Sequence, residues 1–160
     1  MAVDQFLKLE KIDGEAQDKE HAKEIDILAW SWGMSQSGTT HMGAGGGAGK
    51  ASFQDLSVTK YVDKSSMTLM LYLAQGKHIP KARLTVRKAG GTPLEYIIID
   101  LEDVIVTSIS TGGSGGEDRL TENVTLNFSV VKTQYVPQGA DGKGQAAVEF
   151  GFDIAANVAL

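Results

Sequence analysis

The sequence predicts a mainly β protein, an antiparallel β-barrel or tight sandwich of two packed sheets with one α-helix on its flank. Most segments alternate apolar and polar residues with a period of two, which is typical of strands with one buried face. One segment, residues 63–76, has the helical period instead. No regular succession of strand, helix and strand is present, so a parallel sheet is not expected. At 160 residues the chain is expected to form a single domain, 1–160.

The alternating segments are expected to form the strands of the barrel. The alternation in Leu120–Val136 slips at Val130 and Val131, which predicts a β-bulge there. Residues 11–24 are charged and have no period, so they are expected to form a solvated connection. The predicted strands are Val3–Leu9, residues 25–37, Phe53–Tyr61, Ala82–Arg87, Leu94–Ile109, Leu120–Val136 and a last strand containing Val148, Phe150, Phe152 and Ile154.

Two of these strands carry specific predictions about their faces. In Ala82–Arg87, the apolar Leu84 and Val86 are expected to face inward, and the polar residues between them outward. The outward set is Arg83, Thr85 and Arg87. In Leu94–Ile109, one face is expected to hold Ile97, Ile99, Leu101 and Ile105.

The predicted helix begins near Asp63 or Ser65, whose side chains can accept hydrogen bonds from the free N–H groups of the first turn. It ends at Gly76, since glycine readily adopts the left-handed conformation that closes a helix. Its apolar residues follow the i, i+3, i+4, i+7 spacing, so the helix is expected to pack against the barrel or a neighbouring subunit. This stripe consists of Met67, Met70, Leu71 and Ala74, widened by Leu69, Tyr72 and Leu73.

The first half of residues 25–50 has one large apolar face and one small neutral face. The apolar face, expected to point into the core, consists of Leu28, Trp30, Trp32 and Met34. The opposite face consists of Ala29, Ser31, Gly33, Ser35 and Ser37. Such a face, like the Thr, Asn and Ser face of Leu120–Val136, has none of the Lys and Glu common on solvent-exposed strands. It suits an interface between subunits or the wetted wall of a channel.

The second half, Gly38–Lys50, loses all periodicity and is mostly glycine. Its 13 residues could span roughly 45 Å when extended, whereas a hairpin loop needs about two to five residues. The loop is therefore expected to reach toward something outside its own barrel. The residues proposed to make this contact are Gly38, Thr39, Thr40, His41, Met42, Gly43, Gly45, Gly46, Gly47, Gly49 and Lys50.

Several function classes are excluded as expectations from the sequence. A net charge of −5 argues against binding nucleic acid, and no segment reaches the ~20 apolar residues of a membrane span. There are no cysteines, and His21, His41 and His78 are scattered, so surface histidines and no metal site are expected. Neither Gly49-Lys50 nor the glycine-rich 112–116 has the context of a phosphate loop or a nucleophile elbow. We therefore expect neither catalysis nor a cofactor.

Several blocks of the sequence resemble the Hcp (haemolysin-coregulated protein) family of bacterial type VI secretion. They are DILAWSWGMSQSG with the glycine loop, QDLSVTKYVDKSS, GKHIPKARLTVRKAGG and STGGSGGEDRLTENVTLNF, and the resemblance covers Met1–Tyr135. It implies a barrel that assembles into six-membered rings, which stack into a tube propelled by a contractile sheath. It also implies small effector proteins carried in the lumen, contacts with sheath and tip proteins, and release from the bacterial cytoplasm. The first residues, MAVDQFLKLEKID, interrupt every apolar run with a charge, so no secretory signal peptide is expected.

Under this resemblance, Ala29, Ser31, Gly33 and Ser35 become candidates for lining the lumen and binding effectors, with the subunit interface as the alternative. The loop Gly38–Lys50 becomes a contact to an adjacent subunit or ring. Two other functions stay open. One is a phage-type tail-tube subunit, which shares the same physics. The other is a monomeric β-barrel carrier of a small ligand, which would need a large apolar cavity.

Overall fold

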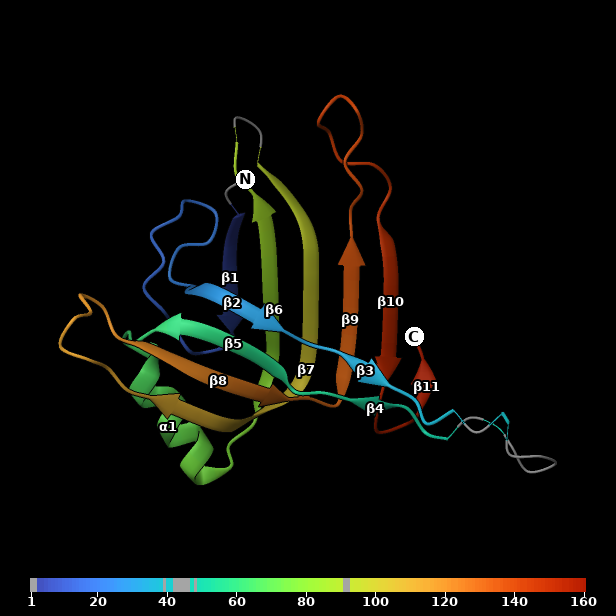
Figure 1. Ribbon diagram of the computed structural model, residues 1–160, viewed down its shortest axis with the longest axis horizontal. Coiled ribbons are helices and arrows are strands. Elements are labelled where there is room, and N and C mark those ends of the chain that lie inside the picture. The colour runs from blue at the N-terminus through green and yellow to red at the C-terminus, as the bar shows by residue number, and fades with distance from the viewer. Residues whose placement is uncertain (1–2, 39, 42–46, 48, 91–92) are drawn as a thin grey trace.

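The computed structural model describes residues 3–38, 40–41, 47, 49–90 and 93–160 and is almost entirely antiparallel β-structure (Figure 1). The single helix named among these residues is α1 (Ser65–Gln75). The strands are β1 (Val3–Leu9), β2 (Ile25–Ser31), β3 (Met34–Ser35), β4 (Ser52–Phe53), β5 (Leu56–Tyr61), β6 (Ile79–Lys88), β7 (Leu94–Thr111), β8 (Thr121–Asn127), β9 (Val130–Tyr135), β10 (Val148–Asp153) and β11 (Val158–Ala159).

Six strands close into an antiparallel barrel in the order β1-β2-β5-β8-β7-β6, with β6 pairing back onto β1. The 18-residue β7 makes this closure possible because it serves two neighbours along one edge. Its second part, Ile105–Thr111, pairs with β8, whereas Ile97–Glu102 pairs with β9. Strands β9, β10 and β11 therefore extend the sheet beyond the barrel, and we call them the sheet extension (Figure 1). The mainly β barrel with a flanking helix is confirmed.

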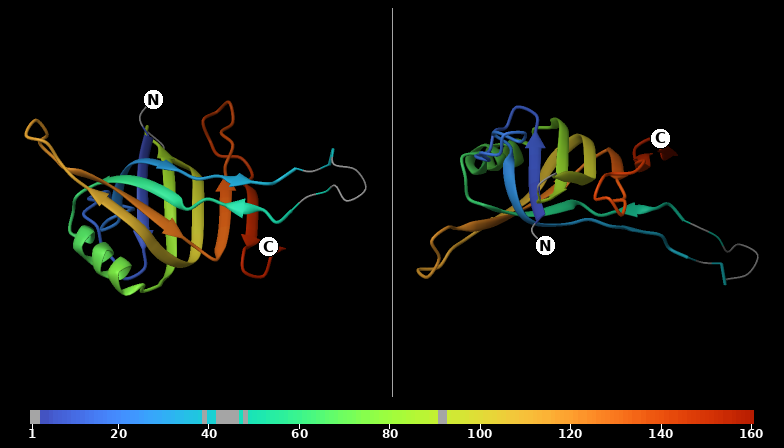
Figure 2. Two further views of the ribbon diagram at one scale, coloured as in Figure 1. Left: turned by 60° about the horizontal axis from the view of Figure 1, so that its bottom comes forward. Right: turned by 90° about the horizontal axis from the view of Figure 1, so that it is seen from above.

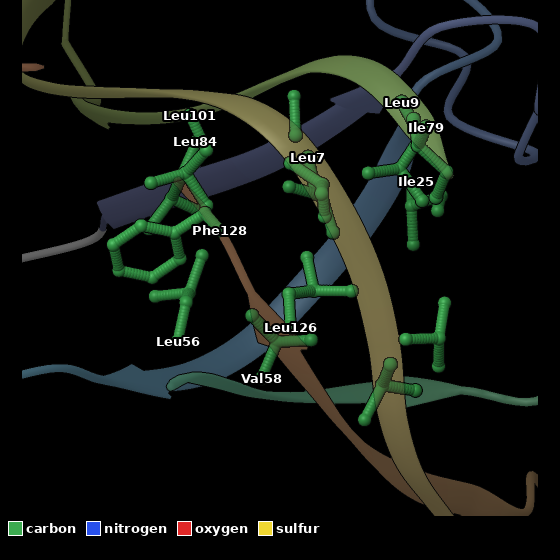
Figure 3. Close-up of a cluster of buried hydrophobic side chains, with 14 of the residues drawn as sticks. Leu7, Leu9, Ile25, Leu56, Val58, Ile79, Leu84, Leu101, Leu126 and Phe128 are labelled. Atoms are coloured by element: carbon green, nitrogen blue, oxygen red, sulfur yellow. The ribbon is translucent and has the colours of Figure 1, made fainter. Parts of the chain in front are cut away.

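The barrel interior is filled by apolar side chains from alternating positions of its strands (Figure 3). In the β6–β7 register Leu84 lies opposite Ile99 and Leu101 lies opposite Ala82. In the β5–β8 register Leu56 lies opposite Leu126, and none of these residues is more than 3% exposed. The core is thus packed from both halves of the barrel. Further labelled members are Leu7, Leu9, Ile25, Val58, Ile79 and Phe128.

The predicted face of β7 is wrong beyond residue 103. Ile99 and Leu101 are buried as expected, but Val104 and Val106 then take the core positions and Ile105 is only half-buried. Asp103 adopts the left-handed conformation, with φ 54°, which exchanges the two faces of the strand. This change of phase within β7 also accompanies the change of partner from β9 to β8.

The predicted bulge at Val130 and Val131 is instead a corner between two strands. β8 ends at Asn127 and β9 begins at Val130, and the two pair along different parts of β7. At this corner both backbone polar groups of Ser129 are hydrogen-bonded. The N–H donates to Glu102 O at 3.1 Å, and the carbonyl accepts from Ile154 N at 2.8 Å. An alternation slip in sequence is therefore compatible with a corner as well as a bulge.

The connection 11–24 is not simply solvated, since it covers the outer face of β1 and β6. Ile12, Ala16 and His21 are buried. Thr85 and Arg87 do point outward as predicted, yet both are buried beneath this segment. The Arg87 guanidinium donates to Asp18 Oδ2 at 2.5 Å and to Asp4 Oδ2 at 3.1 Å, and this contact lowers the pKa of Asp18 to about 2.

Helix α1 forms where predicted, and Gly76 closes it with φ 62°. Asp63 Oδ1 accepts a hydrogen bond from Ser65 N at 2.9 Å, as expected for a residue at the helix start. The predicted stripe faces the barrel only in part: Leu69 and Tyr72, from its widening, are buried, whereas Met67 and Leu71 are exposed. Among the described residues, no helix is long and apolar enough to cross a membrane.

Candidate functional site: a neutral polar sheet face

The outer face of β2, β5, β8 and the second part of β7 carries aligned rows of small, neutral side chains. In the first row, Ser31 lies opposite Ser57, which lies opposite Thr125, which lies opposite Ser108. The neighbouring row runs in the same way through Ala29, Thr59, Asn123 and Ser110. No residue of these two rows carries a charge. We call this surface the neutral face.

Hydrogen bonds between side chains hold the neutral face in order. Thr59 Oγ1 donates to Asn123 Oδ1 at 2.7 Å, and Thr125 Oγ1 lies 2.5 Å from Ser108 Oγ. At its edge, Asp55 accepts from Thr107 Oγ1 at 2.7 Å and from Asn127 Nδ2 at 2.9 Å. Hydroxyl and amide groups are thus fixed by one another while still facing water.

A cluster of charged residues lies at the end of this face away from Asp55. The Arg119 guanidinium lies 3.6 Å from the ring centroid of Tyr61, and both residues line a surface hollow with Asp26, Asp63 and Glu15. Burial raises the pKa of Asp26, against the opposing attraction of Arg119. The outer surface is therefore uncharged along the two rows and becomes charged where these strands end.

The predicted small-residue set is only partly brought together. Ala29 and Ser31 are exposed on the neutral face, Gly33 follows the end of β2 and is half-buried, and Ser35 is exposed in β3. The structure adds residues from β5, β7 and β8 that the site prediction did not include. Their alternation was visible in the sequence, but the register that aligns them with Ser31 was not.

The apolar side of the same strand is partly corrected. Trp30 and Trp32 pack against the core as predicted, but Leu28 and Met34 are 40% and 44% exposed. The β2–β5 register shifts between Ile27 and Ala29, which turns Leu28 out of the core. The fully buried residues of this strand are instead Ile25 and Ile27.

Beyond β2 the chain forms a two-stranded arm. Met34 pairs with Phe53 and Ser35 with Ser52, and the Phe53 ring stacks on Phe152 of β10 with centroids 5.4 Å apart. The described part of the arm then runs away from the barrel past the sheet extension (Figures 1 and 2). Of the predicted contact loop, the structure describes Gly38, Thr40, His41, Gly47, Gly49 and Lys50; Thr39, Met42, Gly43, Gly45 and Gly46 lie outside the described residues.

His21 was wrongly expected at the surface, for it is buried and its ring stacks on Phe6 at 4.5 Å. Its Nδ1 lies 2.9 Å from Glu24 Oε2 and its Nε2 lies 2.7 Å from Glu95 Oε1. Glu20 also lies nearby, so that Glu20, His21 and Glu95 could approach a metal ion together. Both ring nitrogens already face carboxylates, which favours a protonated imidazolium donating two hydrogen bonds over a metal ligand.

A pH dependence follows from this arrangement. Burial lowers the pKa of His21, but the hydrogen bonds to Glu24 and Glu95 outweigh it, so the pKa lies above its ordinary value of 6.5. A raised pKa contributes stability below pH ~6.5 that is lost as the pH rises through the folded-state value. In urea unfolding, the native chain should therefore lose its advantage over His21→Gln as the pH is raised from 6 to 9. An advantage that is constant over this range would contradict the ion-pair assignment.

The described residues define a closed six-stranded antiparallel barrel that has an interior filled by core side chains and a neutral outer face on four of its strands. The family described as "Type VI secretion system effector, Hcp" matches residues 6–135. The chain belongs to the Hcp family and is a type VI secretion tube protein.

Individual relatives agree with this assignment. The chain is 62% identical over 160 residues to Protein hcp1 of Pseudomonas aeruginosa, covering 99% of each sequence. It is 39% identical to Hcp1 from Salmonella typhimurium, whose crystal structure it matches over 100% of both chains with a TM-score of 0.82. A structure described as a type six secretion system protein matches with a TM-score of 0.93 at 32% identity, over 99% of this chain and 100% of the other.

Proposed function

We propose that six copies of this chain form a ring, that rings stack into the secretion tube, and that the neutral face lines its channel and accommodates small effector proteins. The observation that carries this proposal is the neutral face itself, with two uncharged rows across four strands. Short, uncharged, mutually hydrogen-bonded side chains leave a channel open. They also bind no cargo strongly through charge, so different effectors can pass.

The opposite sheet supports this division of surfaces by contrast. Its outer face carries a charged row, in which Lys8 lies opposite Arg83, Arg83 opposite Asp100, and Asp100 opposite Lys132. Such a row is ordinary for a surface in contact with water. We assign it to the outside of the ring, where sheath proteins would pass, and the tube ends to contacts with the tip.

The proposal also includes how the protein acts and where. It works by assembly, without catalysis, cofactor, nucleic acid or membrane insertion, and it leaves the bacterial cytoplasm through the secretion system. The alternative of a small-ligand carrier is disfavoured because the barrel interior is occupied by core side chains (Figure 3). A phage-type tail tube would use the same surfaces, and the family match favours secretion.

Changing Ser31 to glutamine tests the channel assignment. Ser31 is exposed on the neutral face, so the longer neutral side chain should leave the barrel core intact. If the face lines the channel, rings form normally but bind or export effectors poorly. If the face lies between subunits, overpacking of about 1–3 kcal/mol per site weakens the ring itself. Ring mass by light scattering and effector retention on immobilised rings distinguish the two.

Ser114→Gln is the matched control, since it makes the same substitution at an exposed serine in the loop between β7 and β8. It should leave effector retention unchanged. Normal rings with undiminished effector export in the Ser31 variant would refute both assignments of the neutral face.

A further inference from the structure

The connection between β1 and β2, residues 11–24, folds as a strap on the outer face of the barrel and is the blue loop between these strands in Figure 1. Backbone hydrogen bonds join its two limbs, from Gly14 N to Lys23 O at 2.8 Å and from Ala16 N to Glu24 O at 2.9 Å. We call residues 11–24 the strap. It is a small folded unit of its own, and side-chain contacts hold it against the sheet.

Two ionic contacts fasten the strap to neighbouring strands. In the first, the Arg87 guanidinium of β6 donates to Asp18 Oδ2 at 2.5 Å. This contact lowers the pKa of Asp18 to about 2, and arginine stays charged, so the pair is unchanged between about pH 5 and pH 9. In the second, His21 Nε2 lies 2.7 Å from Glu95 Oε1 of β7. Only this second contact contains a side chain that titrates near neutral pH.

Carboxylates surround the edge of the His21 ring. Its Nδ1 lies 2.9 Å from Glu24 Oε2, its Nε2 faces Glu95, and a Glu20 carboxylate oxygen lies within 4.8 Å of a ring nitrogen. Phe6 of β1 covers one face of the ring by stacking on it at 4.5 Å. A charged ring therefore has an acceptor on each nitrogen and an aromatic face beneath it.

The basic side chains of this region are engaged elsewhere. Arg87 and Arg83 of β6 are both paired with aspartates, and Lys19 and Lys23 of the strap are exposed. Among the described residues, the two carboxylates that contact the His21 ring have ion pairs with no other side chain. The charge on His21 is thus their counter-ion.

Loss of the proton from His21 breaks one of its two contacts. A neutral imidazole has one N–H donor, so its other nitrogen turns a lone pair toward a carboxylate oxygen and the two repel. Glu24 is kept beside His21 by a backbone hydrogen bond from Glu24 N to His21 O at 3.1 Å, and its side chain is only 13% exposed. The Glu95 side chain is 36% exposed and can turn into water. The contact that breaks is therefore the one to β7.

We propose that His21 is a pH-operated latch, which fastens the strap to β7 in its protonated form and releases it in its neutral form. The contact between Arg87 and Asp18 stays closed, so the strap moves away from β7 while it remains attached to β6. Its opening brings water to Phe6, which is 4% exposed in the closed form. The outer surface of the sheet then changes with pH, while the barrel core on the other side of the sheet stays closed.

The direction of the pKa shift gives the pH range of the latch. Burial lowers the pKa of His21, but its contacts with Glu24 and Glu95 raise it above the ordinary 6.5 in the closed strap. In the open strap the ring faces water, and its pKa returns toward that ordinary value. The latch is therefore fully effective below pH ~6.5 and is lost as the pH rises through the closed-state pKa. Each unit between the two pKa values changes the opening equilibrium by about tenfold.

Hydrogen exchange followed by mass spectrometry tests the latch, with protection factors corrected for the intrinsic effect of pH. In the native chain, the protection of residues 16–24 should fall by about tenfold or more between pH 6 and pH 9. The barrel strands β5 and β8 should keep their protection over the same range. In the His21→Gln variant, the protection of the strap should be the same at both pH values, because glutamine does not titrate.

Glu95→Gln tests the chemistry of the latch from the side of β7. A glutamine amide accepts a hydrogen bond from a charged ring and donates one to a neutral ring. The strap of this variant should therefore stay protected at both pH values. The pKa of His21, followed by NMR of its ring protons, should fall relative to the native chain.

His78→Gln is the matched control, since it makes the same substitution at an exposed histidine that contacts one carboxylate, Asp103. It should leave the pH response of the strap unchanged. Equal protection of the native strap at pH 6 and pH 9 would overturn the inference, as would a native-sized pH response in His21→Gln. A parallel loss of protection in β5 and β8 would also overturn it, because pH would then act on the whole fold. The native comparison and Glu95→Gln decide the question even where His21→Gln does not fold.

Discussion

Replacing Lys60 with methionine should lower the free energy of unfolding by about 3–5 kcal/mol. The Lys60 side chain is fully buried, and its ammonium group pairs with Glu122, which is 1% exposed. Lys60 Nζ also lies 3.1 Å from Asp63 Oδ1 and 3.1 Å from Ser66 Oγ, which donates to Glu122 Oε1 at 2.6 Å. The cluster joins β5 and β8 to the start of α1. Without Lys60, the Glu122 carboxylate stays buried without its counter-ion.

Two comparisons separate the buried charge from lost packing. The double variant Lys60→Met, Glu122→Gln should recover much of the stability, because no uncompensated charge remains. Arg83→Met breaks an exposed pair with Asp100, and should change stability by only about 0–1 kcal/mol. Urea unfolding at one fixed protein concentration measures all three. Equal losses in the single and double Lys60 variants would show that the charge is not what destabilises the fold.

Shortening the loop Gly38–Lys50 to a four-residue turn should abolish stacking into tubes while leaving the barrel folded. The described part of the loop projects past the sheet extension and contributes no residue to the core cluster. The base of the arm, held by the stacking of Phe53 on Phe152, should remain in position. Electron microscopy of concentrated rings and a secretion assay measure the loss.

A matched change of length elsewhere controls for loop shortening as such. The loop between β7 and β8, residues 112–120, is also glycine-rich, and removing Gly115 and Gly116 there should leave the barrel folded. Comparison of the two deletions shows whether stacking depends on this particular arm. If the variant with the shortened arm forms tubes as readily as the native chain, the reaching role of the loop is wrong.

Much of the fold follows from periodicity in the sequence, because the alternation of apolar and polar residues along a strand reflects which side chains are buried in the core. β1 and α1 are found close to their predicted bounds, and β5 ends at the predicted Tyr61, whereas the single strand predicted over Leu120–Val136 is divided into β8 and β9. The errors lie where the backbone departs from regular geometry: the left-handed Asp103, the register shift at Leu28 and the corner at Ser129. Each of these exchanges or redirects the faces of a strand, and no local pattern of hydrophobicity specifies it.

The candidate site shows the same limit. Ser31 could be assigned to a small neutral face from its own strand, but its alignment with Ser57, Thr125 and Ser108 depends on pairing between distant segments. The apolar stripe of α1 is real, yet the sequence could not tell which side of the helix meets its own barrel. Leu69 and Tyr72, from the widening of the stripe, do so, whereas Met67 and Leu71 face outward.

The most direct test of the central claim is the mass of the native protein in solution. Light scattering coupled to size exclusion, at micromolar concentration and over a series of dilutions, should give about six times the 17.0 kDa of one chain. That result would support a ring assembled from copies of this barrel. A single species of 17.0 kDa at every dilution would contradict the ring, and with it the assignment of the neutral face to a channel.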